Sequence, residues 1–193
     1  MLGGSKSSMN ETTGQDNKSS DTESEVMSIE DAIRGFLNEY EYLHEFRLQK
    51  LLYIAEMINS VSKENRLTDA EFKPYMYGSY SEDLSDTLEN LDESGEIPSE
   101  PDWQYGKTAT KYLGTADQQA EHEIDHNNLF QEIREALKGV TSEDLGKWSK
   151  ETFLYENTDF GSEMRFDRLD KDKAINDLEK ISPKLKNVLE NRL

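Results

Sequence analysis

The segment from about Glu45 to Lys63 constrains the fold more than any other part of the chain. Its apolar residues recur at the three- and four-residue spacing of an α-helix, and further apolar residues widen that surface beyond one face. These residues are Leu48, Leu51, Leu52, Tyr53, Ile54, Ala55, Met57, Ile58 and Val61. A helix with so much apolar surface must be covered by other elements. We therefore expect it to lie at the centre of its domain.

Capping signals predict further helices on both sides of this segment. A Ser or Thr followed three residues later by an acidic or amide side chain is typical of a helix N-terminus, and a glycine often follows the C-terminus. These signals and the apolar spacing predict helices that start near Ser28, Ser79, Thr115, Thr141 and Lys171, and a new helix that starts at Ser182. Gly95 and Gly139 mark the ends of the second and third of the capped helices, which start near Ser79 and Thr115. We expect the Thr115 helix to continue to about Lys138.

Three shorter elements are also predicted. Residues 68–72 are expected to form a helical turn, and the alternation of Met164, Phe166 and Leu169 favours a brief strand or an extended arm. Aromatic and β-branched residues flank a Gly-Lys turn signal at Gly106, which predicts a small β-hairpin over residues 103–113.

The predicted fold class is therefore mainly α, with a winged-helix-like core and a small β-hairpin. We expect residues 27–193 to form one helical domain, with its core in 36–113 and C-terminal helices in 115–193. Residues 1–26 are polar and acidic and contain few apolar side chains, so we expect a disordered tail. That tail is interpreted either as an inert solubilising extension or as a segment that folds on a partner.

Composition limits the possible locations and chemistry. The chain has no cysteine, so disulfides, thiolate zinc sites and thiol nucleophiles are excluded. It also lacks an apolar run long enough to span a bilayer. A cytoplasmic protein is expected.

The acidic residues are concentrated in the middle of the sequence. The formal net charge is −19, and residues 82–138 contain 15 acidic side chains and 4 basic ones. Such a surface repels nucleic acid and attracts a basic partner. Solubility, including solubility in a salt-rich cytoplasm, is the alternative explanation.

An aromatic turn separates the central helix from the next one. Its sequence is Tyr75-Met76-Tyr77-Gly78-Ser79-Tyr80-Ser81. Tyrosines in such a turn either fill the gap between two helices or anchor a partner, because tyrosine gives a large contact area with few rotatable bonds. The candidate partner-binding positions are Tyr75, Tyr77, Gly78, Tyr80 and Ser81.

One motif suggests metal chemistry. His122 to His126 matches H-E-x-x-H, which in metalloproteases holds zinc with two histidines on one helical face. The surrounding residues are polar and acidic, whereas a catalytic zinc helix is mostly apolar, so we interpret the two histidines as exposed. No nucleotide-binding or nucleophile motif occurs. We therefore expect no enzymatic activity, no metal and no cofactor.

The run from Leu48 to Tyr53, the Tyr77-Gly78-x-Tyr80-Ser81 turn and a helix that closes on Gly95 resemble the Panacea family, the SocA-like antitoxin domain. Ser79 stands where that family usually has proline. The resemblance implies a mainly helical domain that neutralises a toxin encoded nearby by binding it directly, without catalysis.

The alternative is a winged-helix nucleic-acid-binding regulator, in which the helix over residues 81–94 would read the nucleic acid and Lys107 and Lys111 would contact it from the hairpin. The carboxylates of that helix make nucleic acid an unfavourable partner.

Overall fold

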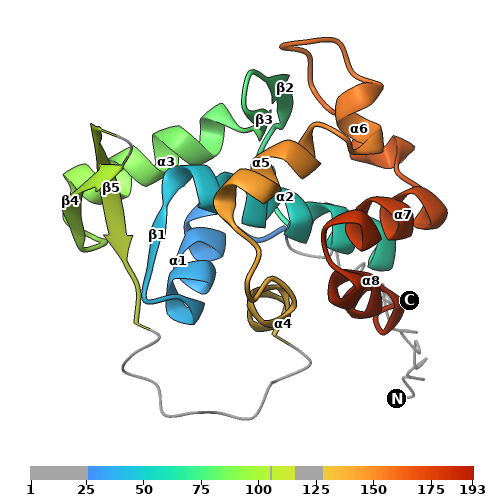
Figure 1. Cartoon of the computed structure of the whole chain (residues 1–193), viewed down its shortest axis with the longest axis horizontal. Helices are drawn as coiled ribbons and strands as arrows, with labels where there is room; N and C mark the ends of the chain where they lie inside the picture. Colours follow the sequence, from blue (N-terminus) through green and yellow to red (C-terminus); the bar gives the residue numbers. More distant parts are fainter. Residues whose placement is uncertain (1–25, 105, 116–127) are drawn as a thin grey trace, which may run out of the picture.

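The computed structural model describes residues 26–104, 106–115 and 128–193. These residues are mainly helical, as predicted, and they form two small antiparallel sheets where the sequence predicted one hairpin (Figure 1). The helices and strands follow one another in the order α1 Ile29–Glu39, β1 Tyr42–His44, α2 Glu45–Ser62, β2 Lys73–Tyr75, β3 Gly78–Tyr80, α3 Glu82–Glu93, β4 Ser99–Gln104, β5 Lys107–Leu113, α4 Leu129–Ala136, α5 Ser142–Ser149, α6 Phe153–Glu156, the 3-10 turn η2 Phe166–Arg168, α7 Lys171–Ile181 and α8 Pro183–Glu190. Among the described residues, no helix is both long and apolar enough to cross a bilayer.

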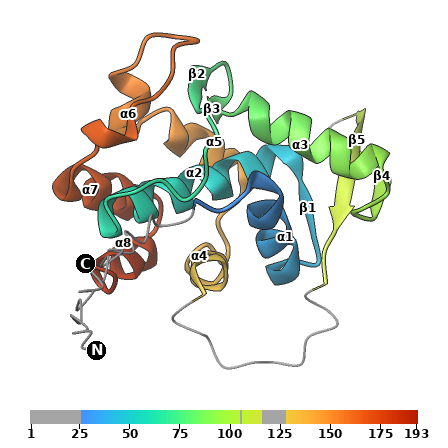
Figure 2. The same cartoon turned by 180° about the vertical axis from the view of Figure 1, so that it is seen from behind.

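Helix α2 lies at the centre of the molecule, as the sequence predicts (Figure 2). It contacts α1, α3, α4, α5 and α7 as well as strands of both sheets. Every residue from Leu48 to Ile58 is buried. Its Tyr53 ring lies within about 6 Å of the rings of Phe72, Trp148 and Phe166, and its hydroxyl bonds the Thr152 hydroxyl at 2.9 Å. One core therefore joins the central helix to the C-terminal part of the chain.

Several predicted helix starts are confirmed by hydrogen bonds. The Ser28 side chain accepts a bond from the Asp31 backbone N–H at the start of α1, and Thr141 and Asp144 form a reciprocal capping box at α5. The restart after α7 is also confirmed, because the Ser182 side chain caps α8 and Pro183 occupies its first turn. Gly95 follows α3 with a φ of +72°, which glycine adopts readily.

The predicted cap of α3 at Ser79 is wrong. Ser79 lies in β3 opposite Pro74, and the α3 cap is Ser81, whose hydroxyl accepts a bond from the Leu84 backbone N–H. Because Ser79 is paired within β3, it cannot cap the helix. Ser81, two residues later, is the residue at the helix start.

The predicted hairpin is confirmed and is longer than expected. Strands β4 and β5 pair from Ser99 opposite Tyr112 to Gln104 opposite Lys107. Strand β1, which the sequence analysis did not identify, pairs with β5 and gives a sheet of order β1-β5-β4. β1 has only three residues, too few to show an alternating pattern.

The predicted helical turn at residues 68–72 is wrong, because that segment is irregular. The buried carboxylate of Glu56 on α2 takes the local backbone donors instead. It accepts hydrogen bonds from the Leu67 N–H at 3.0 Å and the Thr68 N–H at 2.9 Å, and it also bonds the Thr68 hydroxyl. The Arg66 guanidinium completes the set at 2.8 Å. The loop is thus bonded to the central helix rather than to itself.

Two further predictions are corrected. Residues 116–127 lie outside the described part, but Asn128 is extended and its side chain caps a new helix, so no continuous helix runs from Thr115 to Lys138. The segment from Met164 to Leu169 is not a strand, because Phe166–Arg168 forms a 3-10 turn. Met164, Phe166 and Leu169 all face the core, which explains their apolar alternation. Of the predicted tail, residues 1–26, only residue 26 is described. The H-E-x-x-H motif lies wholly outside the described residues.

Replacing Glu56 by glutamine should destabilise the fold strongly. An amide cannot accept four hydrogen bonds with one oxygen, and Arg66 would lose its ionic partner, so we expect a loss of about 3–5 kcal/mol in the free energy of unfolding. Urea titration followed by circular dichroism measures this. The control is Glu143→Gln, which breaks an exposed ion pair with Lys147 and should cost about 0.5 kcal/mol or less. Similar losses in both variants would contradict the assigned role of Glu56.

Candidate partner-binding site

The aromatic turn forms a tight β-hairpin. Strands β2 and β3 pair antiparallel, with Tyr75 opposite Gly78, so Met76 and Tyr77 form its tip. The side chains at the tip point into solvent: Tyr75 is 47 %, Met76 61 % and Tyr77 67 % exposed. Large apolar side chains are seldom so exposed without a binding function when they are contiguous.

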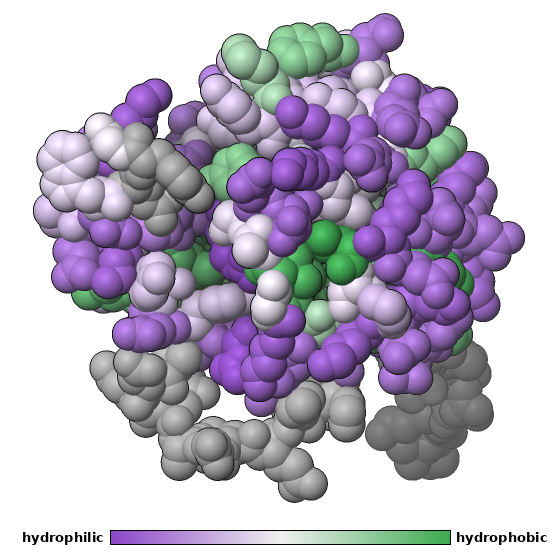
Figure 3. Space-filling model, viewed as in Figure 1, coloured by the Kyte–Doolittle hydropathy of each residue, from purple (hydrophilic) through white to green (hydrophobic). Residues whose placement is uncertain are grey.

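A third exposed aromatic residue joins the tip from a distant part of the chain. The ring of Phe160 stacks on the ring of Tyr75, with the two centroids 5.6 Å apart. The Tyr75 ring also contacts the Tyr80 ring, at a centroid distance of 5.5 Å. The Tyr155 hydroxyl also donates to the Tyr75 carbonyl at 2.8 Å. We call Tyr75, Met76, Tyr77 and Phe160 the aromatic patch. In Figure 3, apolar side chains gather at the top of the molecule, over this hairpin and the loop after α6.

Gly78 is required by packing as well as by conformation. Its φ is +104°, and a Cβ atom at this position would lie 1.9 Å from Ser149 Oγ and 3.1 Å from the Gly146 carbonyl oxygen on α5. The hairpin can approach α5 this closely only with glycine at this position. Gly78 is therefore a structural residue that fixes where the tip lies.

Two buried polar side chains of α2 hold the base of the hairpin. The Gln49 amide makes a pair of 2.8 Å hydrogen bonds with the backbone N–H and carbonyl of Ser81. The Lys50 Nζ donates to the Ser79 carbonyl at 2.5 Å and lies 4.9 Å from the centre of the Phe46 ring. These bonds explain why polar residues occur inside a fully buried helix.

The environment of Lys50 changes its protonation. Burial, together with the smaller effect of the nearby Lys150 charge, lowers the pKa of the Lys50 ammonium to about 7. This lysine inside the core is therefore only partly protonated near neutral pH.

A pocket of about 300 Å³ opens beside the hairpin. Phe46, Tyr75, Tyr77 and Tyr80 form its aromatic walls, and it is also lined by Glu45, Gln49, Lys50 and Gly78. Its size suits one large side chain of a partner.

The structure separates the five sequence-predicted positions into two groups. Tyr75 and Tyr77 are exposed and Tyr80 is half-buried beside them, whereas Gly78 and Ser81 are buried and shape the backbone. Sequence reasoning missed Phe160, Met76, Gln49 and Lys50. The polar residues within an otherwise apolar helix were a usable signal for the last two, because each needs a hydrogen-bond partner.

The helix that follows the hairpin is strongly negative. α3 starts directly after Ser81 and contains six carboxylates and no basic residue. Within the residues that the structure describes, no cluster of three or more potential metal ligands occurs. The third histidine, His44, bonds the Asp102 carboxylate at 2.9 Å.

A family model described as "Antitoxin SocA-like, Panacea domain" matches residues 48–153. The match begins in α2 and ends at the start of α6, so it includes the hairpin, the acidic helix and all of the pocket lining except Glu45 and Phe46. No curated protein and no solved structure matches the chain.

The low pKa of Lys50 predicts a pH dependence of stability. The pKa is about 7 in the folded chain and near 10.5 in the unfolded one. Between these values the unfolded chain binds more protons, so stability should rise as the pH increases from 7 to 10, by on the order of 3 kcal/mol. Urea unfolding at several pH values measures this.

Lys50→Met should abolish this part of the pH dependence, and the control Lys147→Met, which removes an exposed lysine, should retain it. Equal slopes in the wild type and Lys50→Met would show that Lys50 is not responsible.

Proposed function

Because the chain belongs to the SocA-like antitoxin family defined by the Panacea domain, we propose that it neutralises a toxin encoded by a neighbouring gene by binding the toxin directly through the aromatic patch. The observation that carries the proposal is the patch itself, a contiguous exposed group of aromatic and methionine side chains on a braced hairpin. Family membership supports a toxin–antitoxin role in general. The direct contact is our inference.

The patch has the composition of a binding hot spot. Tyrosine, phenylalanine and methionine are enriched in interface cores, where a few anchors supply most of the binding energy. The pocket beside the patch, of about 300 Å³, offers a place for one apolar or aromatic side chain of the toxin. Occlusion of the toxin surface by this contact is the proposed mechanism, and no catalytic step is involved.

The backbone under the patch is fixed before any partner arrives. Gln49 and Lys50 bond its base, and the Tyr155 hydroxyl bonds the Tyr75 carbonyl. A braced hairpin loses little conformational entropy on binding, which favours affinity.

The charge of α3 supports a basic partner. Its carboxylates, which include Glu82 and Asp83 in the first turn, begin next to the hairpin. Complementary charge accelerates association and guides orientation. We therefore propose that the toxin presents a basic surface around an apolar anchor. Of a second acidic segment proposed to contribute, residues 121–135, the structure describes only residues 128–135.

We interpret the N-terminal half as winged-helix-like. Apart from the β2–β3 hairpin inserted between α2 and α3, the order α1, β1, α2, α3, β4, β5 and the sheet order β1-β5-β4 support this interpretation. The architecture does not by itself indicate nucleic-acid binding, and α3, the helix that would enter a groove, carries only negative charge. We also propose that residues 27–193 act as one unit in the cytoplasm. The shared core and the absence of cysteine support this.

Co-expression with the neighbouring gene product tests the proposal. That product should arrest growth alone, and the full chain should restore growth. Tyr77→Ala and Phe160→Ala should each weaken binding about 10- to 100-fold, as loss of a hot-spot residue does, and so reduce rescue while circular dichroism stays unchanged.

The matched control is Trp103→Ala, which removes an equally large aromatic side chain, 75 % exposed, from the β4–β5 hairpin. Rescue should persist in this variant. A harmless neighbouring product, full rescue by Tyr77→Ala, or equal loss in Trp103→Ala would each refute the proposal. Tight binding of duplex DNA at low salt would favour the nucleic-acid alternative.

A further inference from the structure

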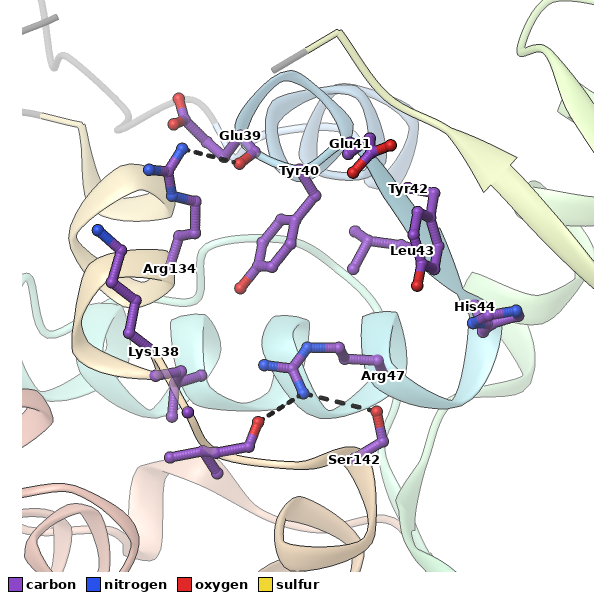
Figure 4. A pocket seen from close by; sticks show the side chains of 13 residues that line it. Glu39, Tyr40, Glu41, Tyr42, Leu43, His44, Arg47, Arg134, Lys138 and Ser142 are labelled. Atoms are coloured by element: carbon purple, nitrogen blue, oxygen red, sulfur yellow. Dashed lines mark hydrogen bonds between the residues drawn. The ribbon is translucent and has the colours of Figure 1, made fainter. Parts of the chain in front are cut away.

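A second and larger pocket lies on another part of the molecule. It has a volume of about 560 Å³ and is formed by the end of α1, β1, the first turns of α2 and the connection between α4 and α5 (Figure 4). Neither the aromatic patch nor the acidic helix α3 contributes to it. We call it the Arg47 pocket.

Arg47 brings a positive charge into this pocket. Its Nη1 donates to the Val140 carbonyl at 2.9 Å and to Ser142 Oγ at 3.5 Å. Within the described ranges it forms no ion pair with a carboxylate. A guanidinium stays charged at any physiological pH, and it donates five N–H groups in a fixed plane. Nε and Nη2 are thus left for an acceptor that enters the pocket.

Tyr40 supplies a second donor without an acceptor. In Figure 4 its ring extends from the end of α1 and its hydroxyl points toward α2, between the side chains of Arg47 and Lys138. The hydroxyl oxygen is buried and has no partner at hydrogen-bonding distance in the described part of the chain. Burial raises the pKa of this phenol more than the nearby Arg47 guanidinium lowers it, so it remains a donor at neutral pH. A buried polar group without a partner is rare in native proteins and calls for a ligand or water.

Two more cations line the same pocket. Arg134 and Lys138 on and after α4 share one carboxylate, that of Glu135, at 2.5 and 2.6 Å. Glu135 is shared between them, and the carboxylates of Glu39 and Glu41 also line the pocket, so these two cations add no excess of positive charge. Figure 4 shows Glu39 beside Arg134, and both lining carboxylates away from Arg47.

We propose that the Arg47 pocket binds the phosphate group of a small phosphate monoester. A phosphate has three terminal oxygens, which can accept hydrogen bonds from two N–H groups of Arg47 and from the Tyr40 hydroxyl, three donors in all, whereas a carboxylate has two oxygens. Its negative charge also matches the Arg47 guanidinium, which forms no ion pair in the described ranges. The pocket is much larger than one phosphate, and its apolar side chains, Leu43, Leu137 and Val140, can contact the organic part of the ester.

Calorimetric titration of the full chain at constant ionic strength tests this proposal. The probes are phenyl phosphate, inorganic phosphate and benzoate. Phenyl phosphate should bind saturably with a Kd below about 1 mM, more tightly than inorganic phosphate because its ring contacts the apolar wall, and more tightly than benzoate. Failure of phenyl phosphate to bind would overturn the proposal, and equal or tighter binding of benzoate would overturn the choice of phosphate.

Two variants connect binding to the named groups. Arg47→Met should weaken phenyl phosphate binding about tenfold or more, as expected for a lost charge-assisted hydrogen bond. The control Arg165→Met removes an exposed arginine that pairs with Asp167 outside the pocket, so it changes the net charge equally and should leave the affinity unchanged. Equal affinity in Arg47→Met and the wild type, or equal weakening by Arg165→Met, would refute the role of Arg47.

Tyr40→Phe keeps the ring and removes only the hydroxyl, so it separates a ligand role from a purely structural one. A ligand role predicts several-fold weaker phenyl phosphate binding, with the stability of the ligand-free chain unchanged or higher, because no hydrogen bond is lost in the described structure. Unchanged affinity in this variant would show that the hydroxyl does not contact the ligand and would overturn the three-donor arrangement.

Discussion

The structure depends on a helix that is buried on every side and yet contains polar residues. Gln49, Lys50 and Glu56 lie within the buried part of α2. An unsatisfied buried polar group costs about 1–3 kcal/mol, and more when it is charged, so each of these side chains must find partners. Backbone groups of Ser79, Ser81, Leu67 and Thr68 provide them. The central helix therefore builds the core and also determines the paths of the loops on either side of the hairpin.

The parts of the fold that the sequence predicted are those with local causes. The apolar spacing of α2, the capping box at Thr141 and the glycine after α3 each depend on residues within one or two turns. The errors arise where a distant group decides the outcome. Residues 68–72 look helical by themselves, but the Glu56 carboxylate takes their backbone donors. Strand β1 exists because β5, about 70 residues later, offers it a partner.

The candidate site follows the same division. The turn at Gly78 was predictable, because glycine next to three tyrosines is a local signal. Glycine is also required at this position because of the close contact with Ser149. Ser149 lies on α5, and nothing in the sequence indicates that α5 packs against the turn. Phe160 joins the patch from the loop after α6, far from Tyr75 along the chain, so no local pattern links the two rings. Among the five candidate positions, tertiary packing likewise decides which rings are exposed and which residues are buried and support the backbone. Sequence spacing cannot predict this.

Support and contact are divided between different residues of the β2–β3 hairpin. Gly78, Gln49 and Lys50 hold the backbone, whereas Met76 and Tyr77 at the tip have most of their surface in solvent. A randomised library confined to those two positions can therefore change the contact surface without loosening the scaffold. A protein built in this way can acquire a new target by a few substitutions that leave its fold unchanged.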